Sequence, residues 1–324
     1  MTANLKFISE RQLVTFALFS YNQENYIREA IKGAFSQTYE PLEIILSDDC
    51  SNDGTFKIMQ EMAAEYEGPH KVQVRQSCEN RRLMGHINDV VSLAQGDIIV
   101  MAAGDDISLP ERTAEHLTIY NRWPETYAVC SDFFPMSEPF APFRKQRQQA
   151  VREYTLLHHM NNVGGVGCGA TYSYRRKCFT WPAFVPECIE MEDRVLPTRA
   201  ALLGRVAFHK GRLVRYRTPG ETGQLEVKRR WLRSKALKPI VTHLRENLRT
   251  ARANKRLGML SEFGALLALY IGYQKVTVAN KNSSRQGKFL RKIFANFIGM
   301  PSAFILRIKR LTDFYSPILK RVGR

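Results

Sequence analysis

No run of 18 or more apolar residues occurs in this chain of 324 residues, so no ordinary transmembrane helix is expected. The first residues lack a basic segment followed by an apolar one, so no secretory signal is predicted. The six cysteines include no Cys-x-x-Cys pair, and no histidine lies near one at zinc-site spacing, which argues against a zinc site. Free thiols in a reducing compartment are the simplest interpretation. Apolar residues make up 44% and charged residues 24%, as in ordinary globular proteins.

Acidic residues are scarce in the last third of the chain. From Arg205 onward there are 28 Lys and Arg but only 5 Asp and Glu, whereas the first 204 residues carry 20 basic and 26 acidic side chains. The overall charge of +17 therefore comes from the tail. Such asymmetry indicates two parts with different tasks, and we predict one domain over residues 1–222 followed by a basic helical region over 223–324.

Apolar runs and helical stripes alternate along the first half of the chain. Strands are predicted at 13–19, 42–46, 72–74, 98–101 and 127–130, and helices at 25–35, 55–66, 85–94 and 110–120. Further on, we expect a strand at 170–174, a helix at 192–203 and short strands at 206–208 and 213–216. This alternation predicts an α/β fold with a mostly parallel sheet flanked by helices.

Three acidic pairs stand out against this pattern: Asp48-Asp49, Asp105-Asp106 and Glu192-Asp193. The first two follow predicted strands, and ligands of open α/β sheets bind where parallel strands end. Carboxylates there suit Mg²⁺, which is usually shared with substrate phosphates. Each pair also has a simpler interpretation, because acidic residues favour turns and the first turns of helices.

Several motifs then occur in a characteristic order. They are Phe-Ser-Tyr-Asn at 19–22, Gln-Thr-Tyr at 37–39, Ser-Asp-Asp-Cys-Ser-Asn-Asp-Gly-Thr at 47–55, Ala-Gln-Gly-Asp at 94–97 and Gly-Asp-Asp at 104–106. In order and spacing, this set resembles family-2 glycosyltransferases over residues 13 to about 220. Members of that family have a GT-A fold, which is Rossmann-like, and use nucleotide-diphosphate sugars.

The resemblance implies roles for individual positions. Nucleotide-sugar binding is implied for Phe19, Tyr21, Asn22, Asp48, Asp49, Asn88, Gly104 and Asp105. Asp105 and Asp106 correspond to the metal-binding end of the family's Asp-x-Asp motif, so Mg²⁺ or Mn²⁺ is an expected cofactor. Asp193 corresponds to the base that deprotonates the acceptor hydroxyl, which implies an inverting displacement at the anomeric carbon.

One position departs from the family pattern. Ala103 stands where the family commonly has the first Asp of its motif, which puts metal dependence in doubt more than sugar transfer. A catalytically inactive scaffold with the same fold is therefore one alternative. A nucleotidyltransferase that activates sugars is another, although its usual glycine-rich phosphate loop is absent after the first strand, where residues 19–22 stand instead.

The basic tail mixes cationic and apolar stretches. Six basic residues lie between Lys228 and Lys238, and apolar segments follow at 263–273, 289–297 and 304–311. Helices with a cationic and an apolar face lie at anionic membrane surfaces, so we expect a cytoplasmic protein held peripherally on the inner face of the cell membrane. The acceptor would be a glycan or lipid-linked glycan of a bacterial surface polysaccharide. Nucleic acid is not an expected partner, since no such motif is present, and a helical cap with solvated charges is the simpler alternative.

Overall fold

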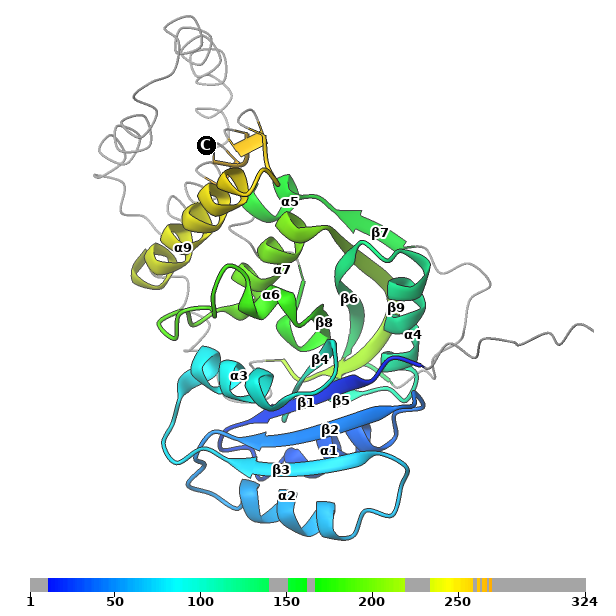
Figure 1. The fold of residues 1–324 in the computed structure, drawn as a ribbon. Helices are drawn as coiled ribbons and strands as arrows, with labels where there is room; N and C mark the ends of the chain where they lie inside the picture. Colours follow the sequence, from blue (N-terminus) through cyan, green and yellow to red (C-terminus); the bar gives the residue numbers. More distant parts are fainter. Residues whose placement is uncertain are drawn as a thin grey trace, which may run out of the picture. The chain divides into compact units, whose positions relative to one another are not determined.

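The computed structural model describes residues 11–139, 151–161, 167–218 and 234–258, and isolated residues up to 269. Within them one sheet of nine strands has the order β3-β2-β1-β4-β8-β6-β9-β5, with β7 paired to β9 (Figure 1). The strands are β1 (Val14–Ser20), β2 (Leu42–Asp48), β3 (Lys71–Gln76), β4 (Ile98–Ala103), β5 (Ile107–Ser108), β6 (Thr126–Pro135), β7 (Val151–Tyr154), β8 (Tyr172–Arg175) and β9 (Arg205–Tyr216). The predicted α/β fold is confirmed.

The first half of the sheet is parallel, because β1 pairs in parallel with both β2 and β4, and β2 with β3. Helices α1 (Ile27–Phe35) and α2 (Thr55–Ala64) cover one face, and α3 (Arg82–Leu93) covers the other (Figure 1). Both faces of β1 are therefore buried, which explains its continuous apolar run. Phe16 and Leu18 lie in the core cluster shared with α1 and α2, whereas Phe19 meets His86 of α3.

The second half of the sheet is mixed rather than parallel. Strand β8 is antiparallel to both β4 and β6, while β6 and β9 are parallel. The two short strands expected at 206–208 and 213–216 are one strand, β9, because the segment between them continues the pairing with β6 through a register shift. The remaining helices are α4 (Arg112–Arg122), α5 (Leu156–Asn161), α6 (Lys177–Thr180), α7 (Glu192–Leu203) and α9 (Ser234–Ala253), with a 3₁₀ turn at Gly169–Thr171.

Gly96 is required by close backbone packing between the turn before β4 and the start of β1. A Cβ atom there would lie 2.5 Å from the Thr15 nitrogen and 2.7 Å from the Val14 carbonyl carbon. The Gly96 N–H also donates to the buried Glu43 carboxylate at 3.0 Å. We expect Gly96→Ala to lower the free energy of unfolding by about 3 kcal/mol, because backbone atoms must move. Urea denaturation measures this, with Gly258→Ala as control, since nothing lies within 4 Å of the added Cβ there.

Helix α9 belongs to the predicted basic region and packs on α7. Its His243 Nε2 lies 2.9 Å from the guanidinium of Arg199, which is almost fully buried. No helix of the described residues has the length and apolar character needed to cross a membrane. Most of the predicted membrane-binding segments lie outside the described residues, so the division at residue 222 and the membrane contact stay predictions.

Candidate active site

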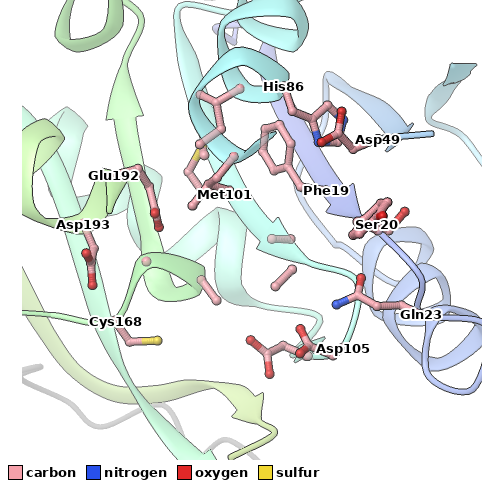
Figure 2. A pocket seen from close by; sticks show the side chains of 18 of the residues that line it. Phe19, Ser20, Gln23, Asp49, His86, Met101, Asp105, Cys168, Glu192 and Asp193 are labelled. Carbon is pink, nitrogen blue, oxygen red and sulfur yellow. The ribbon is translucent and has the colours of Figure 1, made fainter. Parts of the chain in front are cut away.

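A cavity of about 440 Å³ opens where β1 and β4 end, between the first turns of α3 and α7. Five carboxylates line it, namely Asp49, Asp105, Asp106, Glu192 and Asp193. Figure 2 shows Glu192 and Asp193 on one side of the cavity, with Asp49 and Asp105 on the opposite side. Members of all three acidic pairs, which are far apart in the sequence, therefore meet in one place.

One wall of the cavity is aromatic and neutral. The Phe19 ring meets the His86 ring edge to face, with centroids 5.2 Å apart. The His86 Nε2 atom lies 2.5 Å from the Ser47 hydroxyl, which also accepts a hydrogen bond from Arg75. Burial, and then the charge of Arg75, lowers the pKa of His86 to about 3, so this imidazole is uncharged at physiological pH. The wall therefore suits a flat, uncharged ring such as a nucleobase.

Asp49 stands beside this wall. Its carboxylate is buried and accepts a hydrogen bond from the Arg81 backbone N–H at 2.9 Å. Burial raises the pKa of Asp49, although hydrogen bonds from Arg81 and Ser77 oppose the rise. An acceptor in this position can bind the N–H groups of a base or the hydroxyls of a ribose.

The Asp105-Asp106 segment is held in place by Arg217 at the end of β9. The Arg217 backbone N–H donates to Asp106 Oδ1 at 2.7 Å, and its side-chain Nε donates to the Asp105 carbonyl oxygen at 3.1 Å. The Arg217 guanidinium also pairs with Glu29 of α1 at 2.9 Å and lies over the Tyr26 ring. Asp106 is consequently a fixed, buried group, while the Asp105 side chain remains at the cavity surface.

Gly104 lets this segment pass close to the end of β1. A Cβ atom at Gly104 would lie 2.4 Å from Gln23 Oε1 and 2.8 Å from the Ser20 Cβ. The Gly104 N–H donates to the Phe19 carbonyl at 2.8 Å, extending the β1–β4 pairing by one residue. The glycine therefore sets the distance between the aromatic wall and Asp105.

The Asp105-Asp106 edge has the chemistry of a divalent-cation site. Burial raises the pKa of Asp105, and burial together with the charge of Asp105 raises that of Asp106 well above its ordinary range. Two neighbouring carboxylates of this kind would be stabilised by a cation. No group of three or more potential metal ligands occurs among the described residues. A cation held by Asp105 and Asp106 would be shared with substrate phosphates, as is usual for Mg²⁺.

The opposite wall carries Glu192 and Asp193 in the first turn of α7. A Cβ atom at Gly169 would lie 1.9 Å from Glu192 Oε1, so a glycine at this position leaves room for the Glu192 carboxyl. Burial, and then the charge of Asp193, raises the pKa of Glu192 to about 8. Burial also raises the pKa of Asp193, but the neighbouring Arg194 opposes the rise. The two neighbouring carboxyls therefore lie in different electrostatic environments, the pattern by which paired acids take separate roles as acid and base.

The raised pKa of Glu192 predicts a pH-dependent stability. Between its ordinary value of 4.5 and about 8, the folded state binds more protons than the unfolded state, so stability falls as pH rises through this range. Glu192→Gln removes this contribution, and we expect its Tm to exceed the wild-type Tm at about pH 8.5 but not at about pH 5. Thermal unfolding at both pH values measures this. Glu190→Gln, an exposed neighbour, should show no such difference.

Several residues assigned by resemblance line the cavity, and others do not. Those at its surface are Phe19, Tyr21, Asp49, Asp105, Asp106 and Asp193, together with Ala103. Asn22, Asp48, Asn88 and Gly104 do not contribute to its lining. The fully buried Asp48 carboxylate accepts hydrogen bonds from the Ser51 N–H and from Gln76, so it closes the turn after β2, as the simpler interpretation expects. Nucleotide contacts by these four residues stay predictions.

The cavity also contains residues that the sequence did not single out. They include Gln23, His86, Cys168, Met191 and Tyr216. Gln23 follows the motif at 19–22, and Met191 precedes the Glu192-Asp193 pair, so proximity to a motif was the available signal for both. Tyr216 and Arg217 reach the site only through the pairing of β9 with β6 and β5, for which no local pattern exists.

The sequence model described as Glycosyl transferase family 2 matches residues 15–180, which is just over half of the chain. The chain belongs to this family. The match includes β1 to β4 and the Asp105-Asp106 edge of the cavity, and it ends before the Glu192-Asp193 pair.

Curated relatives of this family-2 protein come from several bacteria. EpsE of Bacillus subtilis (strain 168), named as a glycosyltransferase, is 36% identical over 102 residues, which is 32% of this chain and 36% of EpsE. Rv1520 of Mycobacterium tuberculosis, named as uncharacterized, is 39% identical over 113 residues, 34% of this chain and 32% of Rv1520. TuaG of B. subtilis, named for teichuronic acid biosynthesis, is 31% identical over 96 residues, 30% of this chain and 37% of TuaG. The chain thus spans about a third of the length of these relatives.

Solved structures share the fold of this family-2 protein at low sequence identity. Residues 1–349 of Staphylococcus aureus TarS, also solved with UDP, superpose with a TM-score of 0.60 at 16% identity, covering 85% of this chain and 74% of that one. The mannosyltransferase PcManGT from Pyrobaculum calidifontis, solved with GDP-Man and Mn²⁺, gives 0.54 at 16% identity, covering 90% and 82%. These likenesses confirm the predicted GT-A fold.

Proposed function

We propose that this protein is an inverting glycosyltransferase that moves a sugar from a nucleotide-diphosphate donor to a hydroxyl group of a glycan or lipid-linked acceptor. One observation carries the proposal. Asp105 and the Glu192-Asp193 pair lie on opposite sides of one cavity (Figure 2), so the diphosphate and the attacking hydroxyl can be bound on opposite sides of the sugar. Membership of glycosyl transferase family 2 agrees with this arrangement.

The donor would lie along the wall formed by β1, β4 and the start of α3. The base would lie against Phe19 and the neutral His86, with Asp49 accepting its hydrogen bonds. The diphosphate would then reach Asp105 at the end of β4. A divalent cation, when bound by Asp105 and Asp106, would neutralise part of the diphosphate charge and so stabilise the leaving group. The structures of TarS with UDP and of PcManGT with GDP-Man and Mn²⁺ support this class of donor and a metal for those proteins, and we extend both to this chain.

The acceptor would bind on the side of α7. Ionised Asp193 takes the proton of the acceptor hydroxyl as its oxygen bonds to the anomeric carbon. The bond from that carbon to the diphosphate oxygen breaks, and the nucleoside diphosphate leaves with the electron pair. Because attack and departure occur on opposite faces of the sugar, the product has inverted configuration. Glu192, whose pKa is raised to about 8, adds no second negative charge beside Asp193 while it stays protonated.

The biological setting is proposed from the relatives and from the charge of the tail. TuaG is named for teichuronic acid biosynthesis, which supports a role for this chain in bacterial surface polysaccharide synthesis. The excess of basic residues after Arg205 supports contact with anionic lipids on the cytoplasmic side of the membrane. A lipid-linked acceptor at that surface would bring both properties together.

The first experiment measures thermal unfolding with a panel of nucleoside diphosphates and nucleotide sugars, with and without Mn²⁺ or Mg²⁺. A ligand that binds only the folded state raises its stability, so the proposal expects a Tm increase with one nucleotide that grows when metal is added. A Tm increase that does not depend on metal would mean that Ala103, in place of the family's usual Asp, marks a metal-independent site. No increase with any nucleotide from folded protein would favour the inactive scaffold. Pyrophosphate release from a nucleoside triphosphate and a sugar phosphate would instead identify a nucleotidyltransferase.

A further inference from the structure

The segment between α6 and α7, residues 181–191, ends directly at the Glu192-Asp193 pair and has little regular structure of its own. We call it the connecting segment. Its Val185 and Ile189 are buried, whereas its remaining residues are exposed or partly exposed. Its position is therefore set by a few anchors rather than by a helix or strand. Those anchors decide where the first turn of α7 begins.

Two of the anchors come from α3 and from Arg81, the residue just before this helix. The Asn88 side-chain amide donates a hydrogen bond to the Val185 carbonyl at 2.9 Å, across 97 positions of sequence. The Arg81 guanidinium donates to Glu187 at 2.7 Å. Gly85 lies between these anchors, and a Cβ atom there would lie 3.4 Å from the Glu187 carboxyl carbon. The connecting segment is thus seated against one face of α3 (Figure 1).

The same stretch of chain also touches the donor side of the cavity. The Arg81 backbone N–H donates to Asp49 at 2.9 Å, while the Arg81 side chain reaches Glu187. Asn88 directly follows His86 and Ile87, which line the cavity, but its own side chain is not part of the lining. The chain around α3 therefore joins the wall proposed to bind the donor to the segment that leads into the Glu192-Asp193 pair.

We propose that Asn88, with Arg81 and Glu187 in support, is a positioning residue that fixes the connecting segment and thereby the placement of Glu192 and Asp193 relative to the donor. This differs from the role that the resemblance implied for Asn88, which was contact with the nucleotide. The Asn88 amide oxygen contacts no hydrogen-bond donor within the described residues, so its N–H group is the part of the side chain that carries the contact. The effect on turnover rests on the proposed function, whereas the effect on the connecting segment does not.

The test compares Asn88→Leu, which keeps the size of the side chain but removes the donor, with Ser92→Ala one turn later on α3. The Ser92 hydroxyl donates to the Asn88 carbonyl within the helix and does not reach the connecting segment. Glu187→Gln is the second variant. It removes one charge from a half-exposed ion pair, so it leaves folding intact even if Asn88→Leu does not.

Three measurements are made on the full chain: hydrogen–deuterium exchange of residues 181–193, UDP and GDP affinity, and donor KM and kcat. The proposal expects faster exchange of this segment in Asn88→Leu, and to a smaller extent in Glu187→Gln, with nucleotide affinity within about twofold of wild type. It also expects kcat to fall about 10- to 100-fold at little-changed donor KM, because small misplacements of catalytic groups have effects of this size. Ser92→Ala should match wild type in all three measurements.

Other outcomes separate the two proposals. Unchanged exchange in both variants overturns the positioning role, whatever happens to turnover. Loss of nucleotide affinity with unchanged exchange would show that Asn88 contacts the nucleotide instead. A wild-type protein that binds no nucleotide and shows no turnover, but in which Asn88→Leu speeds exchange of residues 181–193, contradicts the proposed function and leaves the positioning role standing.

Discussion

Asp193→Asn is expected to lower kcat by about 10²–10⁴-fold, the usual contribution of a positioned general base. Asparagine keeps the size and most of the polar surface of the side chain but cannot accept the proton of the acceptor hydroxyl. Asp193 lies on the wall of the cavity opposite Asp49 and Asp105 (Figure 2). Nucleotide binding should therefore be retained, and the Tm increase caused by the donor should equal that of wild type.

The measurement is a nucleoside-diphosphate release assay with donor and acceptor, accompanied by donor titration. Asp97→Asn is the matched control, because Asp97 is an exposed carboxylate in the turn before β4 and outside the cavity. Activity within about threefold of wild type in Asp193→Asn would assign the base to another group. Loss of donor binding in this variant would place Asp193 on the donor side and contradict the proposed arrangement.

The same base should give the reaction a pH dependence with a defined sign. Asp193 acts in its ionised form, and burial raises its pKa above the ordinary range, so kcat should fall as pH is lowered through this raised pKa. Glu192, with a pKa of about 8, ionises at higher pH and adds a second charge beside Asp193. Glu192→Gln should remove that alkaline transition and keep the acidic one, which a pH profile of kcat would show.

The central strands could be predicted because their sequence pattern is local. Strands β1 and β2 are buried along their whole length, and such strands are continuous apolar runs that stop at polar turns. Helix α7 was predicted with its observed bounds, since its acidic first turn and the following Gly204 mark both ends. The mixed pairing of β8 was not predictable in this way, because strand direction depends on which neighbour the strand meets.

Only those residues of the site that belong to local sequence motifs could be predicted. Asp49, Asp105 and Asp193 lie in acidic pairs that the sequence displays directly, and the structure brings all three to one cavity. The contacts that hold them join distant positions, such as Arg217 with Asp106 across 111 positions. For Asp48 the sequence could not decide between two roles, because a buried carboxylate that closes a turn and one that binds a ligand look alike in sequence.

Asp105→Asn is expected to remove most of the metal-dependent stabilisation by nucleotide while leaving the free protein at least as stable. The Asp105 carboxylate faces the cavity beside buried Asp106, and burial raises its pKa, so replacing it with a neutral amide relieves an unfavourable charge. With nucleotide and Mn²⁺ at about 100 times Kd, the wild type should gain about 2.7 kcal/mol, and a 100-fold weaker Kd would leave only about 0.4 kcal/mol.

Asp106→Asn is the informative contrast, because Asp106 accepts the Arg217 backbone N–H at 2.7 Å and lies near the buried Arg112. Its replacement should lower the Tm of the free protein, since the buried Arg112 guanidinium loses the neighbouring carboxyl that favours its charged form. Thermal unfolding of both variants with nucleotide alone, Mn²⁺ alone and both together separates the two roles. If Asp105→Asn kept the full Mn²⁺-dependent increase in Tm, the cation would bind elsewhere in the chain. The diphosphate would then be held without Asp105, and the departure at Ala103 would mark such a site.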